Sequence, residues 1–177
     1  GFAHNDQSVR VVQCLEKDGE GLNLTWEVRD GIRNHQMSLM PSTLEGRIVR
    51  FSDKIAYINH DIDDAIRAKI LAESDIPAEY REILGGSTRK RLDTLVHNMI
   101  INSMDKNDIC MSPEVEGAMR KLRQFMYDNL YHGSIAKVEE EKAKELLRKL
   151  FHFYMERPEK MPEEFTRMID KKEPQDR

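Results

Sequence analysis

Apolar residues recur every three or four positions along nearly the whole chain, and this spacing constrains the fold more than any other feature. No run alternates between apolar and polar side chains in the way that predicts a strand. Ser87 precedes one apolar stripe, and Ser112 with Pro113 precedes another, as expected of helix starts. The sequence therefore predicts an all-α fold of about seven or eight helices.

Capping residues predict where several of these helices begin. Asn5 or Asp6 is expected to cap the first helix. Ser42 and Glu45 have the spacing of a capping box, which predicts the start of a long helix that runs to about Leu71. Thr25 is expected to cap a short helix over 26–35, and residues 89–91 are expected to form a solvated basic turn.

Composition limits the class of protein. With 177 residues the chain is long enough for a core of its own. Its net charge of -4 gives no general electrostatic reason to bind nucleic acid or a membrane. Cys14 and Cys110 fit neither a disulfide framework nor a zinc spacing, so we expect a reducing, cytoplasmic location. No apolar run has transmembrane length.

The segment 51–71 combines an apolar stripe with several carboxylates. A helix turns by about 100° per residue, so residues four apart are neighbours on its surface. Asp53, Tyr57 and Asp61 therefore form one stripe, next to an apolar stripe of Ile55, Ile58, Ile62 and Ile66. A tyrosine between two carboxylates could bind a sugar phosphate beside a metal ion, because it offers both a flat ring and a hydroxyl.

A solvated helix face is the simpler explanation of the same acidic residues, and spacing alone favours it. His60 and Asp61 are both metal-ligand types, but adjacent helical residues point about 100° apart and rarely bind one ion. The chain also lacks a glycine-rich phosphate loop, a nucleophile elbow and paired cysteines. The residues alone leave both interpretations open.

Three stretches make the sequence similar to a known family. They are "AHNDQSVRVVQCLE" over 3–16, "GLNLTWEVRDGI" over 21–32 and "PSTLEGRIVRFSDKIAYINHDIDDAIRAKIL" over 41–71. Together they resemble the bacterial deoxyguanosine triphosphate triphosphohydrolase family, within the HD superfamily of metal-dependent phosphohydrolases. "STRKRLDTLVHNMI" and "MSPEVEGAMRKLRQFMYDNLY" extend the resemblance more loosely. The implied fold is part of an HD-type helical bundle over 1–73, followed by a C-terminal helical region over 74–177.

The resemblance implies a role for each of five residues. Asp53 matches a family metal ligand, and Lys54 matches a position that can reach the phosphates. Tyr57 matches the tyrosine that lies against the deoxyribose, and Asp61 matches the aspartate that holds the 3′-hydroxyl. His4 matches a histidine near the scissile phosphate, which is a candidate proton donor. His60 is then not a metal ligand.

The chain departs from the family pattern in one respect. The family's other metal ligands, a histidine and a His-Asp pair, precede the segment that matches "GFAHN", and a late glycine-rich stretch also has no counterpart. We therefore expect a divalent metal, magnesium or manganese, in the intact enzyme and none bound by this chain alone. The implied substrate is a deoxynucleoside triphosphate, and the implied assembly is a homo-oligomer.

Two other functions remain open at this stage. One is a non-catalytic helical module that senses nucleotides or mediates oligomerisation. The other is an HD phosphohydrolase that acts on another phosphate ester, against which Tyr57 and Asp61 argue mildly. The chain by itself is expected to be inactive or nearly so, because one metal ligand cannot hold a catalytic ion tightly.

Overall fold

The computed structural model describes residues 2–36, 38–131 and 134–170, and within these ranges the chain is helical and contains no strand. The predicted all-α fold is confirmed. No described helix is both long enough and apolar enough to cross a bilayer. In chain order the α-helices are α1 His4–Arg10, α2 Glu16–Gly19, α3 Trp26–Arg33, α4 Leu44–Arg67, α5 Ala78–Leu84, α6 Thr88–Ser103, α7 Pro113–Met126, α8 Ser134–Glu156 and α9 Glu163–Asp170.

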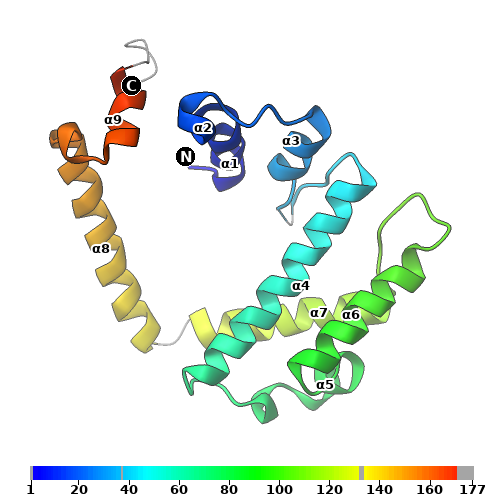
Figure 1. The fold of residues 1–177 in the computed structure, drawn as a ribbon. Helices are drawn as coiled ribbons and strands as arrows, with labels where there is room; N and C mark the ends of the chain where they lie inside the picture. The colour runs from blue at the N-terminus through cyan, green and yellow to red at the C-terminus, as the bar shows by residue number, and fades with distance from the viewer. Residues whose placement is uncertain (1, 37, 132–133, 171–177) are drawn as a thin grey trace.

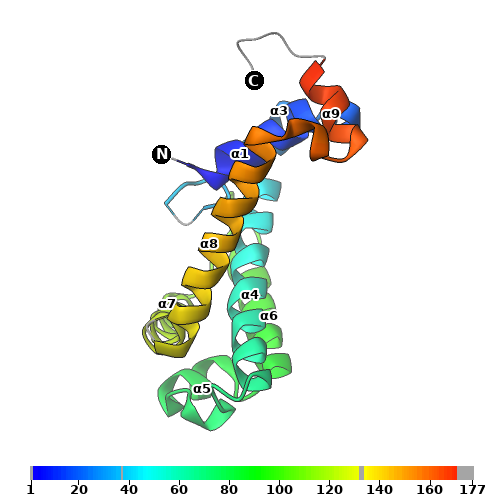
Figure 2. The same cartoon turned by 90° about the vertical axis from the view of Figure 1, so that its left-hand side faces the viewer.

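The long helix α4 organises the rest of the molecule (Figure 1). The short helices α1 and α3 contact each other, and α3 packs against α4 near its beginning. Helices α6 and α7 pack against α4, and α5 packs against α6 and α7. Figure 2 shows α8 leaving the far end of α7 and returning toward the N-terminal helices, where α9 contacts α2.

The core lies between α4, α5, α6 and α7. The apolar stripe predicted on α4 supplies its centre, and Ile62, Leu84 and Leu95 are completely buried. Burying a side chain of this size contributes about 1.5–3 kcal/mol. The other buried apolar residues in the cluster are Phe51, Ile55, Ile58, Ala65, Ile76, Met99, Met111, Val115, Ala118, Met119, Leu122 and Met126.

The start of α4 differs from the prediction. Thr43, not Ser42, is the N-cap, and its hydroxyl accepts a hydrogen bond from the Gly46 amide at 3.1 Å. Ser42 is engaged elsewhere, because its hydroxyl donates to Asp30 Oδ1 at 3.3 Å and its amide donates to Asp30 Oδ2 at 2.7 Å. The helix also ends at Arg67, earlier than predicted. A tertiary contact with α3 thus decides which of two neighbouring hydroxyls caps the helix.

The predicted cap of the first helix is also wrong. The N-cap of α1 is Ala3, and no side chain caps this helix. Asn5 lies inside the helix and is buried, and its Nδ2 donates to the carbonyl oxygen of Arg33 at 2.8 Å. Asp6 forms a surface ion pair with Arg33 at 3.3 Å. Both residues join α1 to the end of α3.

The starts of α6 and α7 confirm the predicted caps. Ser87 accepts from the Lys90 amide at 3.4 Å, and Ser112 accepts from the Val115 amide at 3.4 Å. The basic turn is solvated only in part, because Arg91 is 1% exposed. Buried positions recur every four residues along α6, at Arg91, Leu95 and Met99, so the side chain of Arg91 faces the core.

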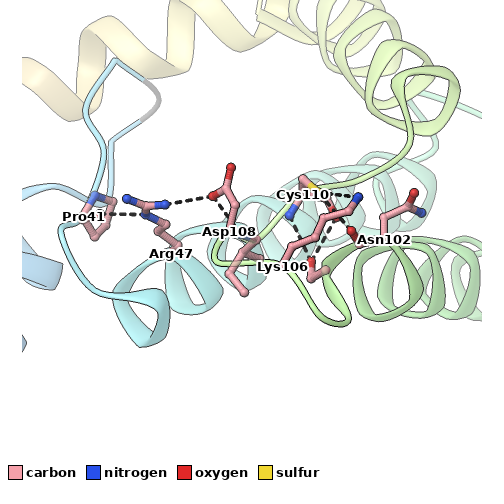
Figure 3. A network of polar contacts seen from close by, with 8 residues as sticks. Pro41, Arg47, Asn102, Lys106, Asp108 and Cys110 are labelled. Carbon is pink, nitrogen blue, oxygen red and sulfur yellow. Dashed lines mark hydrogen bonds and ion pairs between the residues drawn. The ribbon is translucent and has the colours of Figure 1, made fainter.

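A polar network fixes the connection between α6 and α7 to the start of α4 (Figure 3). Arg47 donates to the Pro41 carbonyl at 3.0 Å and to Asp108 Oδ1 at 2.9 Å. Further along the same connection, Cys110 Sγ lies 3.8 Å from Lys106 Nζ and 3.2 Å from the carbonyl oxygen of Asn102. The beginning of α4 is therefore held from two directions, by α3 and by this connection.

Candidate functional site

Four of the five predicted site residues lie on α4, which is continuous from Leu44 to Arg67. Asp53 and Tyr57 are exposed, Tyr57 by 62%, whereas Lys54 and Asp61 are partly buried. The ammonium of Lys54 lies over the ring of Phe51, 5.1 Å from its centroid. Because Asp53, Tyr57 and Asp61 are spaced four apart on an unbroken helix, they share one stripe of its surface.

Lys54 stands in an unusual electrostatic environment. The pKa of Lys54 is lowered from the ordinary 10.5 to about 8, chiefly by partial burial and in smaller part by the nearby cations Arg50 and Arg123. Glu116 on α7 and Asp53 on α4 act in the opposite direction and raise this pKa. A cation whose charge is this poorly compensated favours the approach of an anion.

The pKa of Lys54 predicts how stability depends on pH. Between pH 8 and 10.5 the unfolded chain holds this proton more tightly than the folded chain does, so the free energy of unfolding rises with pH across that window. Urea unfolding at steps of pH checks this. Lys54→Met should flatten the rise, whereas Lys121→Met, at an exposed position on α7, should leave it in place. An equal rise in both variants contradicts the assignment.

The fifth predicted residue, His4, lies in a separate polar cluster at the beginning of α1. Its Nε2 is 3.1 Å from Nε2 of His35, which follows α3. The two rings meet edge to face, with centroids 5.1 Å apart. Gln36 Nε2 lies 3.3 Å from His4 Nδ1 and donates to Asn5 Oδ1 at 2.9 Å. This cluster of His4, Asn5, His35 and Gln36 is called the histidine cluster below.

Arg50 connects the histidine cluster to α4. Its Nε donates to the backbone oxygen of Gln36 at 3.2 Å, and the residue is only 6% exposed. Burial is the main cause that lowers the pKa of Arg50. Lys54 follows Arg50 by one helical turn. The hydrogen bonds between Gln36 and His4 and between Arg50 and Gln36 therefore connect the histidine cluster to the beginning of the acidic stripe. The ring of His4 makes its hydrogen bonds within the histidine cluster, to His35 and Gln36.

Sequence reasoning missed the residues that make this connection. His35, Gln36 and Arg50 lie far from His4 along the chain and carry no spacing signal. The only hint is the position of His35 at the end of the predicted helix over 26–35, where a histidine often bonds to the last carbonyls. Its Nδ1 does lie 2.7 Å from the carbonyl oxygen of Ile32.

The described part of the chain contains no group of three or more His, Cys, Asp or Glu side chains arranged to hold a metal ion. Asp53 therefore remains a single candidate ligand, and His60 is exposed on α4. A lone carboxylate does not satisfy the six or more oxygen ligands that divalent cations of this kind take, so the described residues alone do not form such a site.

Comparisons with known proteins agree on the family. Residues 109–177 match the model of the phosphohydrolase-associated domain. A deoxyguanosinetriphosphate triphosphohydrolase-like protein from Caldanaerobacter subterraneus subsp. tengcongensis is 52% identical over 170 residues, which are 96% of this chain and 50% of the relative. A protein of the same name from Clostridium perfringens strain 13 is 46% identical over 179 residues, covering 96% of this chain and 52% of the relative.

A more distant relative of that name, from Geobacter metallireducens, is 28% identical over 221 residues and again matches 96% of this chain. The chain thus spans about half the length of the curated relatives it matches. The chain belongs to the deoxyguanosine triphosphate triphosphohydrolase family of HD phosphohydrolases.

Proposed function

We propose that the whole protein hydrolyses a deoxynucleoside triphosphate to a deoxynucleoside and intact triphosphate, and that this chain supplies the sugar and phosphate contacts. The observation that carries the proposal is the arrangement on α4. Lys54, a poorly compensated cation, lies beside a carboxylate–tyrosine–carboxylate stripe. The shared name of the relatives supports the substrate class.

Each residue has a part that its chemistry allows. Lys54 stabilises negative charge on the triphosphate. The exposed ring of Tyr57 packs against the deoxyribose and leaves no room for a 2′-hydroxyl, while the Asp61 carboxylate accepts a hydrogen bond from the 3′-hydroxyl. His4 protonates the 5′-oxygen when its bond to phosphorus breaks and water has attacked the α-phosphorus.

A magnesium or manganese ion in the whole protein would take Asp53 as one ligand and its other ligands from outside this chain. Such an ion supplies charge neutralisation at phosphate. Since the described residues do not form a complete site, no step proposed for them passes through the ion. The proposal also predicts that this chain of 177 residues turns over no substrate by itself.

The test compares the whole protein with this chain. Each is incubated with deoxyguanosine triphosphate and manganese, and the products are separated by anion exchange. Deoxyguanosine with intact triphosphate from the whole protein, and no turnover by the chain, is the expected result. Pyrophosphate or single phosphate as the product would overturn the reaction. No product at all would favour a nucleotide-sensing or oligomerisation module instead.

Tyr57 should control the choice between deoxyribose and ribose. In the whole protein, Tyr57→Ala opens the space beside the sugar, so the ratio of kcat/KM for the deoxynucleotide over the ribonucleotide should fall about tenfold or more. Tyr127→Ala, at an exposed tyrosine on the helical segment that follows α7, serves as the control. An unchanged ratio in Tyr57→Ala would remove this residue from the sugar site.

A further inference from the structure

The partners of His35 determine where its proton lies. Its Nδ1 is 2.7 Å from the Ile32 carbonyl oxygen, which can only accept a hydrogen bond. Nδ1 of His35 must therefore carry the proton. In a neutral imidazole the other nitrogen is then an acceptor. It follows that Nε2 of His35 accepts across the 3.1 Å contact, and that Nε2 of His4 is the donor.

The contacts of Gln36 with His4 agree with this assignment. Asn5 Nδ2 donates to the carbonyl oxygen of Arg33 at 2.8 Å, which fixes the orientation of this amide and leaves its oxygen facing Gln36. Gln36 must then present its NH₂ group, which lies 3.3 Å from His4 Nδ1 and 3.5 Å from His4 Nε2. Because His4 Nε2 donates to His35, Nδ1 is the ring nitrogen that can accept from this amide, which requires Nδ1 to be unprotonated. Two chains of hydrogen bonds, each ending at a backbone carbonyl, thus favour the same tautomer.

We propose that His35 is a positioning residue, which holds His4 as the tautomer protonated on Nε2 and makes Nδ1 the nitrogen that exchanges protons. His35 thereby does for His4 what an orienting third group does for a catalytic histidine elsewhere. The burial of Asn5 and the hydrogen bond from Arg50 to the Gln36 backbone hold the histidine cluster against α4. Nothing in the family resemblance assigned a role to His35.

The proton balance of the reaction rests on the proposed function. Protonated His4 carries hydrogen on both nitrogens, and its Nε2–H remains bonded to His35. The Nδ1 proton moves to the 5′-oxygen when the bond between that oxygen and phosphorus breaks. The attacking water forms the new bond to phosphorus and releases one proton to solvent. His4 returns to the neutral tautomer of the structure, the amide of Gln36 faces Nδ1 again, and solvent supplies the next proton.

The first test is spectroscopic and needs no activity. Imidazole nitrogen shifts of the 177-residue chain, labelled with ¹⁵N-histidine, report the tautomer of each ring. The His4 signals are assigned with His4→Gln. The expected result is a dominant Nε2–H form of His4, which becomes a mixture of both tautomers in His35→Ala. His35→Gln should restore the dominant form, because its amide oxygen can accept from His4.

The control is His97→Gln, at an exposed histidine on α6 that contacts Asp93 on the same helix. It should leave the His4 signals unchanged, and helical circular dichroism should show that every variant is folded. A dominant Nδ1–H form in the unmodified chain would overturn the inference. A His4 tautomer that does not change in folded His35→Ala would also overturn it.

The second test uses turnover by the whole protein. His35→Ala should lower kcat by roughly 10- to 100-fold, the scale seen when an outer partner that orients a histidine is removed, with KM nearly unchanged. His35→Gln should recover most of the loss. Failure of the whole protein to hydrolyse deoxynucleotides would refute the proposed function, whereas the tautomer result judges the His35 assignment separately. Full turnover by His35→Ala would overturn the catalytic consequence.

Discussion

Arg91→Ala should destabilise the chain by about 3–5 kcal/mol, because it breaks a buried pair and leaves its partners unmatched. The guanidinium is 1% exposed and joins three elements. Its Nε donates to Asn59 Oδ1 on α4 at 3.0 Å, and Nη1 donates to Glu73 Oε1 at 2.7 Å and to the Gly85 carbonyl oxygen at 3.4 Å. Asn59 is itself buried, so its oxygen would lose its partner without gaining free access to water.

Urea unfolding followed by helical circular dichroism measures this effect. Arg89→Ala, two residues away on the exposed side of α6, should change stability by no more than about 0.5 kcal/mol. Arg91→Lys retains the charge but not the planar fork, so it should lie between the two and remains measurable if Arg91→Ala does not fold. Equal stability of Arg91→Ala and Arg89→Ala would show that the buried network contributes nothing net.

The contrast between these two arginines also shows what sequence could predict. Local signals identified the starts of α6 and α7, because Ser87 and Ser112 cap amides three residues away. Periodicity identified the buried stripe of α4 for the same reason: helix geometry is local. The burial of Arg91 depends instead on Asn59 and Glu73, which are distant along the chain.

The candidate site likewise has one part that the sequence predicts and one part that depends on tertiary packing. The stripe of Asp53, Tyr57 and Asp61 lies on one helix, so the sequence predicts it from helix geometry alone. The roles of these three residues were inferred from the family resemblance. The His4–His35 pair requires α1 and the end of α3 to meet. The choice of Thr43 over Ser42 as the cap of α4 likewise depends on Asp30, twelve residues before Ser42. Contacts of this kind depend on tertiary packing, which the spacing of residues in the sequence does not predict.

Replacing Lys54 should have a large effect on turnover by the whole protein. In the whole protein, Lys54→Met should lower kcat/KM by about 10²- to 10³-fold, because it removes a preorganised positive charge from a partly buried position next to the triphosphate. Lys54→Arg, which keeps a cation, should recover part of the loss. Lys69→Met, at an exposed lysine just beyond the end of α4, is the matched control and should retain full turnover.

The pH dependence makes this prediction specific to the charge of Lys54. The pKa of about 8 in this chain predicts that kcat/KM of the whole protein falls as pH rises through 8, since the deprotonated amine no longer attracts phosphate. Bound triphosphate favours the protonated form and raises this pKa, so kcat should decline only at higher pH than kcat/KM. Lys54→Arg should remove the decline near pH 8, because guanidinium stays protonated there. A decline that persists unchanged in Lys54→Arg would assign it to another group and would leave Lys54 without the phosphate role.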